Sequence, residues 1–114
     1  MFNMTTKKLG ATPFITMNNI WSFSDPPSVA VFTTASIVNG TEWIAYVYHD
    51  EEDGAWQFHS LNSNTDEDEA RIVSLKSITE IDNSVIALAD LPLGWKACRQ
   101  NKSDEWIRCI DARN

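Results

Sequence analysis

The 114-residue chain is poor in glycine and cysteine, and it lacks the short motifs that mark common enzyme sites. It has four glycines, no Gly-rich phosphate loop, no G-x-S-x-G turn, no C-x-x-C pair and no H-E-x-x-H motif. Nucleotide hydrolysis, serine esterase chemistry and the usual zinc sites therefore have no motif to support them, and we expect no cofactor. Cys98 and Cys109 are too few for a secreted disulfide scaffold. We expect reduced, packed thiols, with a disulfide across a hairpin as the alternative.

Long apolar runs are also missing. No segment approaches the roughly 20 apolar residues that a membrane-spanning helix needs. Residues 1–19 contain a Pro and several Asn where a signal peptide would carry an unbroken apolar stretch. We therefore expect a cytoplasmic protein with no membrane partner.

The composition that remains is that of one globular domain. Apolar residues make up 43% of the chain and charged residues 22%, and five Trp and five Phe supply bulky core material. Residues 1–28 lack clean periodicity and end in SDPPS, where two prolines oppose a continued helix or central strand. We interpret 1–28 as an irregular N-terminal arm that packs on the core or on a neighbouring subunit, and 29–114 as the folded domain.

Apolar alternation and turn signals predict a mostly antiparallel sheet with short helices on one face, an α+β fold. Glu42 to His49 is apolar on both faces and should be a central strand, whereas Ala55 to Ser60 places Trp56 and Phe58 on one face and Gln57 and His59 on the other. A helix start is expected at Thr65, a helix capped by Ser74 or Ser77, and another capped by Asp82. The remaining predicted strands are 29–34, 71–75, 93–100 and 105–110.

Negative charge is concentrated in one part of the chain, and the net charge is −7. Residues 49–69 contain no Lys or Arg and eight carboxylates, namely Asp50, Glu51, Glu52, Asp53, Asp66, Glu67, Asp68 and Glu69. This distribution opposes binding to nucleic acid phosphates and favours a basic protein partner. Trp56 and Tyr48 flank the first acidic run and are candidate anchors for such a partner, with core packing as the alternative.

The stretch HDEEDGAWQFHS, residues 49–60, admits two interpretations. A hairpin centred on Asp53 and Gly54 would bring His49 and His59 together, and Asp50 would complete a three-ligand metal site. An EF-hand is excluded, because Ser60 stands where the bidentate Glu is required. The simpler interpretation is a solvated turn in which Gly54 supplies a left-handed backbone position.

Four other residues have side chains that could take part in catalysis or binding, but their positions in the sequence indicate structural roles. Cys98 stands beside Ala97 on a predicted strand, which indicates packing rather than a nucleophile. Trp95 follows a Pro-Leu-Gly turn and is expected to anchor the core, with ligand stacking as the alternative. Arg99 and Arg108 are expected on the solvated surface.

Residues 49–99 carry a set of motifs that resembles a group of small acidic bacterial proteins of unknown function. The shared features are the acidic turn with Gly and W-[QR]-F, the V-S-L strand-to-helix step, I-x-x-I-D-x-S and A-D-L-P-x-G-W, here IVSL, ITEIDNS and ADLPLGW. Similar domains are grouped with immunity proteins of bacterial toxin systems, which neutralise a toxin by binding it. The resemblance thus implies a protein-binding role, with a toxin as the basic partner.

Three functional hypotheses follow. The first is a non-enzymatic binding module, of immunity or regulatory type, that meets a basic partner through 50–53, 66–69 and Trp56. The second is a small metal-assisted hydrolase that uses His49, Asp50 and His59. The third is a structural homodimer subunit whose apolar arm crosses to its neighbour.

Overall fold

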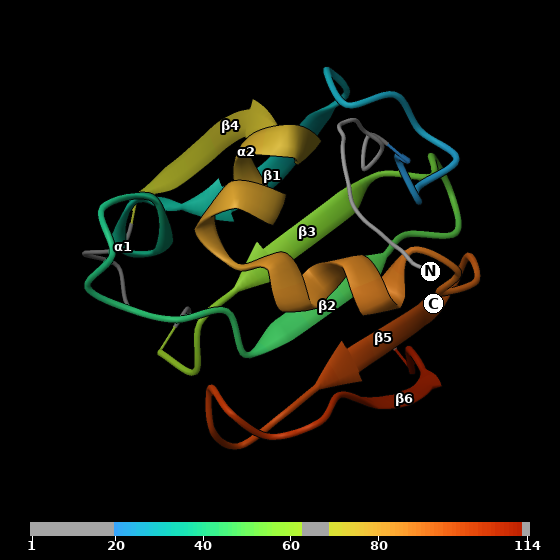
Figure 1. Ribbon diagram of the computed structural model, residues 1–114. Coiled ribbons are helices and arrows are strands. Elements are labelled where there is room, and N and C mark those ends of the chain that lie inside the picture. The colour runs from blue at the N-terminus through green and yellow to red at the C-terminus, as the bar shows by residue number, and fades with distance from the viewer. Residues whose placement is uncertain (1–19, 63–68, 113–114) are drawn as a thin grey trace, which may run out of the picture.

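The computed structural model describes residues 20–62 and 69–112, and six strands in these ranges form one sheet (Figure 1). The strands are β1 (Ala30–Thr34), β2 (Tyr46–His49), β3 (Trp56–His59), β4 (Ala70–Ser74), β5 (Trp95–Cys98) and β6 (Ile107–Ile110). Their order across the sheet is β4-β1-β3-β2-β5-β6. β2 therefore has a partner on both sides, which confirms the predicted central position, but it covers only 46–49 of the expected strand 42–49.

The sheet is mixed, which corrects the expected antiparallel arrangement, although the α+β class fits. Four neighbouring pairs are antiparallel, whereas β1 and β3 run parallel with Phe32 opposite Gln57. The β2–β3 hairpin places β3 between β1 and β2. Because β3 runs antiparallel to β2, it runs parallel to β1 on its other side. Alternating residues predict a strand but not the side on which its partner lies.

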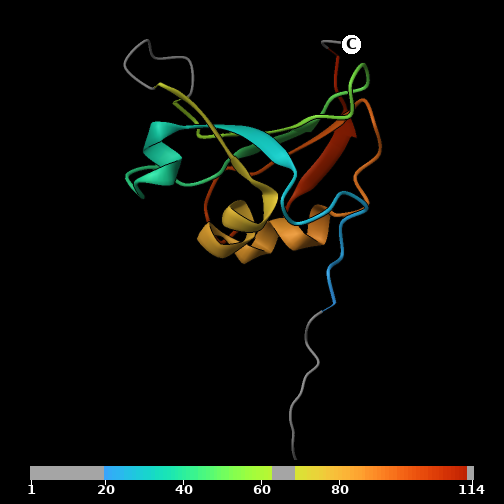
Figure 2. The ribbon, with the colours of Figure 1, turned by 90° about the horizontal axis from the view of Figure 1, so that it is seen from above.

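Two short helical segments lie along one face of the sheet (Figure 2). Helix α2 (Leu75–Ile81) begins after Ser74, whose side chain accepts a hydrogen bond from the Ser77 backbone N–H (3.1 Å). Of the two predicted caps, Ser74 and Ser77, the first is therefore the one observed. Asp82 caps the next segment by accepting from Ser84 N (3.0 Å), but this segment is a 3₁₀ helix, η2 (Asn83–Leu88). A third helix, α1 (Ala35–Val38), follows β1 directly. No helix in the described ranges is long and apolar enough to cross a membrane.

The core lies between the sheet and α2 and η2. Strand residues with inward side chains alternate with outward ones, so Trp56 and Phe58 are buried while Gln57 and His59 are only half-buried, as predicted. Leu75, Ile78, Val85 and Leu88 close the core from the helical side.

Residues 20–28 contain no helix or strand, and two of their aromatic rings contact the core. Phe23 is 5% exposed and packs edge-on against Trp56, with ring centroids 5.3 Å apart. Trp21 packs beside Phe23. The rest of the expected arm, residues 1–19, and the helix start expected at Thr65 lie outside the described residues.

The other face of the sheet is covered by no helix in the described ranges, and we call it the open sheet face. Register places outward residues of five strands side by side on this face. Large apolar groups are among them, since Phe32 is 43% exposed and Ile72 65% exposed. The outward residues include Phe32, Tyr46, Tyr48, Gln57, His59, Ile72, Lys96 and Cys98.

Candidate functional site

The acidic turn, residues 50–53, is a closed and well-bonded loop at one end of the sheet. Asp50 N–H donates to Ala55 O (2.8 Å), and Gly54 N–H donates to Asp50 O (3.0 Å). The Asp53 side chain accepts from Ala55 N–H (2.9 Å), an Asx-type bond. Gly54 has φ of +72°, which confirms the predicted left-handed position. The turn thus holds Glu51, Glu52 and Asp53 exposed to solvent.

Hydrogen bonds link three polar side chains in a row that runs from this turn along β3. Gln57 Nε2 donates to Asp50 Oδ2 (2.6 Å), because a carboxylate can only accept. Gln57 Oε1 then faces His59 Nε2 at 2.9 Å, so this histidine nitrogen carries the proton and donates. The His59 ring also meets Tyr48 edge-on, with centroids 5.8 Å apart. Asp50 is therefore held over the open sheet face by its neighbours.

Beside this row of hydrogen-bonded side chains lies a groove of about 400 Å³, which we call the β1–β3 groove. One wall is the half-exposed ring of Phe32, and carboxylates of the acidic turn stand at one end. Neither Lys nor Arg is among the described residues that line it, which are Phe32, Thr33, Thr34, Asp50, Asp53, Gln57, His59 and Ala70. The groove combines negative charge with an aromatic surface, a composition that suits a cationic ligand.

The three residues of the alternative metal site do not converge. His49 is paired with Trp56 and His59 with Tyr46, three positions further along the hairpin. His49 lies on the helical face, where its ring stacks on Trp56 (3.9 Å between centroids) and Nδ1 donates to Leu91 O (2.7 Å). His59 lies on the open sheet face. An odd offset along a strand reverses the side-chain direction, so the two histidines do not meet as the metal-site interpretation requires.

Trp56, proposed from the sequence as a binding residue, belongs to the core. Its side chain is 2% exposed, and its indole N–H donates to Asp25 Oδ2 (3.0 Å). No face of the ring is left for a partner, which corrects the assignment. Tyr48 remains half-buried on the open sheet face. The sequence did not indicate Phe32 and Gln57 as site residues, because it does not show which face of the sheet the helices leave uncovered.

The two acidic runs do not form one surface within the described residues. Glu69 lies beside Ala35 at the end of β1, since Ala35 N–H donates to Glu69 O (2.8 Å). β1 is parallel to β3, so this end of the sheet is opposite to the acidic turn. Glu69 forms an exposed salt bridge with Arg71 (2.9 Å). Asp66, Glu67 and Asp68 lie outside the described residues.

The cysteines and Trp95 occupy structural positions. Cys98 and Cys109 are free and half-buried on neighbouring strands, where Cys98 is opposite Ile107 and Cys109 opposite Lys96. This diagonal places their Cα atoms about 7–8 Å apart, beyond the usual disulfide range. Trp95 is half-buried against the core, as its expected anchoring role requires.

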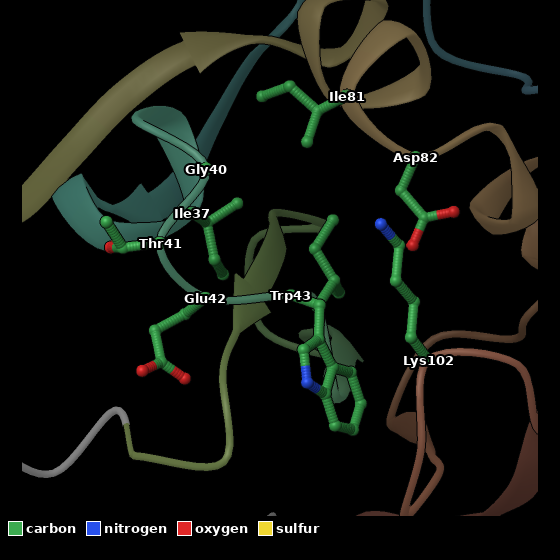
Figure 3. A pocket seen from close by; sticks show the side chains of 9 residues that line it. Ile37, Gly40, Thr41, Glu42, Trp43, Ile81, Asp82 and Lys102 are labelled. Atoms are coloured by element: carbon green, nitrogen blue, oxygen red, sulfur yellow. The ribbon is translucent and has the colours of Figure 1, made fainter.

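A second pocket, of about 180 Å³, lies between the segment after α1 and the junction of α2 with η2 (Figure 3). Ile37, Ile44 and Ile81 form its aliphatic wall, and Trp43 adds an aromatic one. Figure 3 shows Asp82 and Lys102 pointing toward one another along one side. Charges of both signs therefore line this pocket, which gives it no clear preference for a charged ligand.

Asp82 belongs to a buried ion pair behind that pocket. Arg99, expected on the surface, is 2% exposed and forms a salt bridge with Asp82. Its guanidinium also donates to Ile44 O (3.0 Å), Ser84 Oγ (3.1 Å) and Lys102 O (2.9 Å). The Trp106 ring lies 4.1 Å from its central carbon. These bonds make Arg99, directly after β5, a structural cross-link between the segment before β2, the start of η2 and the loop after β5.

Comparison of the chain with protein-family models, with curated proteins and with solved structures gave no match.

Proposed function

We propose that the chain is a non-enzymatic, cytoplasmic binding module for a basic protein, of the immunity or regulatory type. The observation that carries the proposal is the position of the acidic turn at the edge of the open sheet face. Exposed carboxylates there adjoin exposed apolar side chains, with Phe32 43% exposed and Ile72 65% exposed. Apolar surface supplies binding energy, and complementary charge supplies steering and specificity.

The charge of the turn favours a partner that carries positive charge. Glu51 and Glu52 are exposed, and neither forms a salt bridge within residues 20–62 and 69–112. Their field extends about 8 Å into solvent at physiological salt. A basic surface approaching the open sheet face would be attracted before contact, whereas nucleic acid would be repelled.

The metal-assisted alternative has less support, because His49 and His59 lie on opposite faces of the sheet. Groups of three or more His, Cys, Asp or Glu side chains able to hold a metal are absent from residues 20–62 and 69–112. The homodimer alternative, in which the apolar N-terminal arm crosses to a neighbouring subunit, remains a competing proposal.

The experiment combines affinity capture with association kinetics. The chain and its Glu51→Lys/Glu52→Lys variant are used to capture proteins from the native cell, with Glu80→Lys/Glu105→Lys as the matched control on exposed sites away from the turn. A basic protein retained by the chain and the control is then measured by stopped flow. We expect the turn variant to slow its association about tenfold and to weaken the salt dependence. Equal rates for all three chains would refute the proposal.

A further inference from the structure

The β1–β3 groove differs from the rest of the open sheet face in combining a hollow, an aromatic wall and fixed carboxylates. We propose that it receives one cationic side chain of the partner, with arginine favoured over lysine. This inference rests on the proposed binding function and names the chemistry that the groove recognises.

Charge complementarity carries the first step. Asp50 and Asp53 line the groove, and within residues 20–62 and 69–112 neither Lys nor Arg lines it. Counting His as neutral, the described lining residues have a formal charge of −2, from Asp50 and Asp53. A cation entering the groove would be attracted by both carboxylates, whereas an anionic side chain would be repelled by them.

Preorganisation carries the second step. Gln57 holds Asp50 at 2.6 Å, and His59 holds Gln57 in turn at 2.9 Å. Asp53 is fixed by its bond with the Ala55 N–H (2.9 Å). Because these side chains are already ordered, a ligand loses less free energy in ordering them than it would on a mobile acidic loop.

Phe32 carries the third step, which favours arginine. Its ring is 43% exposed and lines the same groove as the two carboxylates. A guanidinium is planar and weakly hydrated, so it stacks on an aromatic ring while its N–H groups face a carboxylate. An ammonium is a compact, strongly hydrated charge and gains less from the ring.

The first test measures binding of the isolated side chain. N-acetyl-arginine methylamide is titrated into the ¹⁵N-labelled chain, and N-acetyl-citrulline methylamide serves as the neutral isostere. We expect saturable shifts at Phe32, Gln57 and Asp53 with the arginine compound, in the millimolar range expected for one weak contact. The citrulline compound should bind at least about tenfold more weakly. Equal binding of both compounds, or no saturable shift at these residues, would overturn the proposal.

Two variants that remove equal charge distinguish specific binding in the groove from general electrostatic attraction by the acidic turn. Asp50→Asn/Asp53→Asn removes two charges and retains oxygen acceptors for Gln57 and the Ala55 N–H. Glu51→Gln/Glu52→Gln removes two charges from the same turn but from residues that do not line the groove. We expect the first variant to bind the arginine compound about tenfold more weakly and the second to change it less than twofold. Equal weakening by both variants would show a general field and no site.

The two proposals can fail separately. Once a basic partner is known, Asp50→Asn/Asp53→Asn should raise its dissociation rate, whereas reversing Glu51 and Glu52 should lower its association rate. An effect of the first variant on association alone would contradict the groove and leave the binding module intact.

Discussion

At the scale of single residues, Arg99 and Arg108 differ in how much they contribute to the stability of the fold. Arg99 is buried with four hydrogen-bond acceptors. Arg108 bonds Asp90 (2.7 Å), whose side chain is 82% exposed, so solvent screens that pair. The surface assignment that the sequence suggested for both holds for Arg108, which is exposed, and fails for Arg99.

Replacement of these two residues gives a matched test. Arg99→Met leaves Asp82 and three further polar groups without their partner, and should lower the free energy of unfolding by about 3–5 kcal/mol. Arg108→Met removes a screened pair and should cost at most about 1 kcal/mol. Urea denaturation followed by tryptophan fluorescence measures both. Similar losses for the two variants would mean that Arg99 is not the cross-link described.

Asp82 adds a pH dependence to the same pair. Burial acts to raise the pKa of Asp82, but hydrogen bonds from Ser84 and Arg99 outweigh it and hold the pKa below its usual 3.8. Because the folded-state pKa is depressed, the unfolded chain takes up the proton first as pH falls. The stabilisation by Asp82 is therefore complete above about pH 3.8 and is lost as pH falls through the lower folded pKa.

The corresponding prediction concerns the slope of stability against pH. The Asp82→Asn variant should be less stable than the parent at pH 7, and its free energy of unfolding should fall less steeply below about pH 4. Urea titrations between pH 2 and 7 measure the two curves. Parallel curves for parent and variant over this range would contradict the role assigned to Asp82.

At the scale of elements, the strands differ in how well they are protected. β2 and β3 have partners on both sides, whereas β4 and β6 are the edges of the sheet. β6 exposes Ile107 and Ile110, at 64% and 68%, and contains neither Lys nor Pro. The charge of Arg108 and the length of only four residues oppose pairing of this edge with another chain.

Hydrogen exchange should reveal this order. Hydrogen-bonded amides of β2 and β3 should exchange at least about tenfold more slowly than those of β4 and β6, since edges open locally at lower free energy. Native-state exchange followed by NMR gives each rate. Equal protection of β6 and β2 would contradict an unpaired β6 edge, and a dimeric mass by sedimentation would then indicate that two copies pair along it.

At the scale of the whole molecule, the arrangement of charge differs from the order of charge in the chain. The acidic residues of 49–69 are consecutive runs in the sequence, yet Glu69 lies at the opposite end of the sheet from the acidic turn. A long-range field adds over both ends, but a site a few ångströms across can use only one. The proposed contact therefore centres on the turn and the β1–β3 groove.

Local features were determined by the sequence alone. The alternation of Trp56 and Phe58 with Gln57 and His59, the Gly54 turn, and the caps at Ser74 and Asp82 all depend on neighbours within a few residues. Backbone geometry and nearby side chains are enough to fix such features. They gave the strands, the helix starts and the acidic turn of the candidate site.

Only the tertiary structure decided which distant groups meet. The parallel pairing of β1 with β3 places Phe32 beside Gln57, and the hairpin register sends His49 and His59 to opposite faces. Arg99 is buried because Asp82, Ile44 and Lys102 come together around it from separate elements. Within the part of the chain that the structure describes, the helices cover one face of the sheet and leave the other open, and this choice depends on the packing of the whole core. Residue patterns specify which faces are apolar, whereas their partners are set by the lowest free energy of the assembled chain.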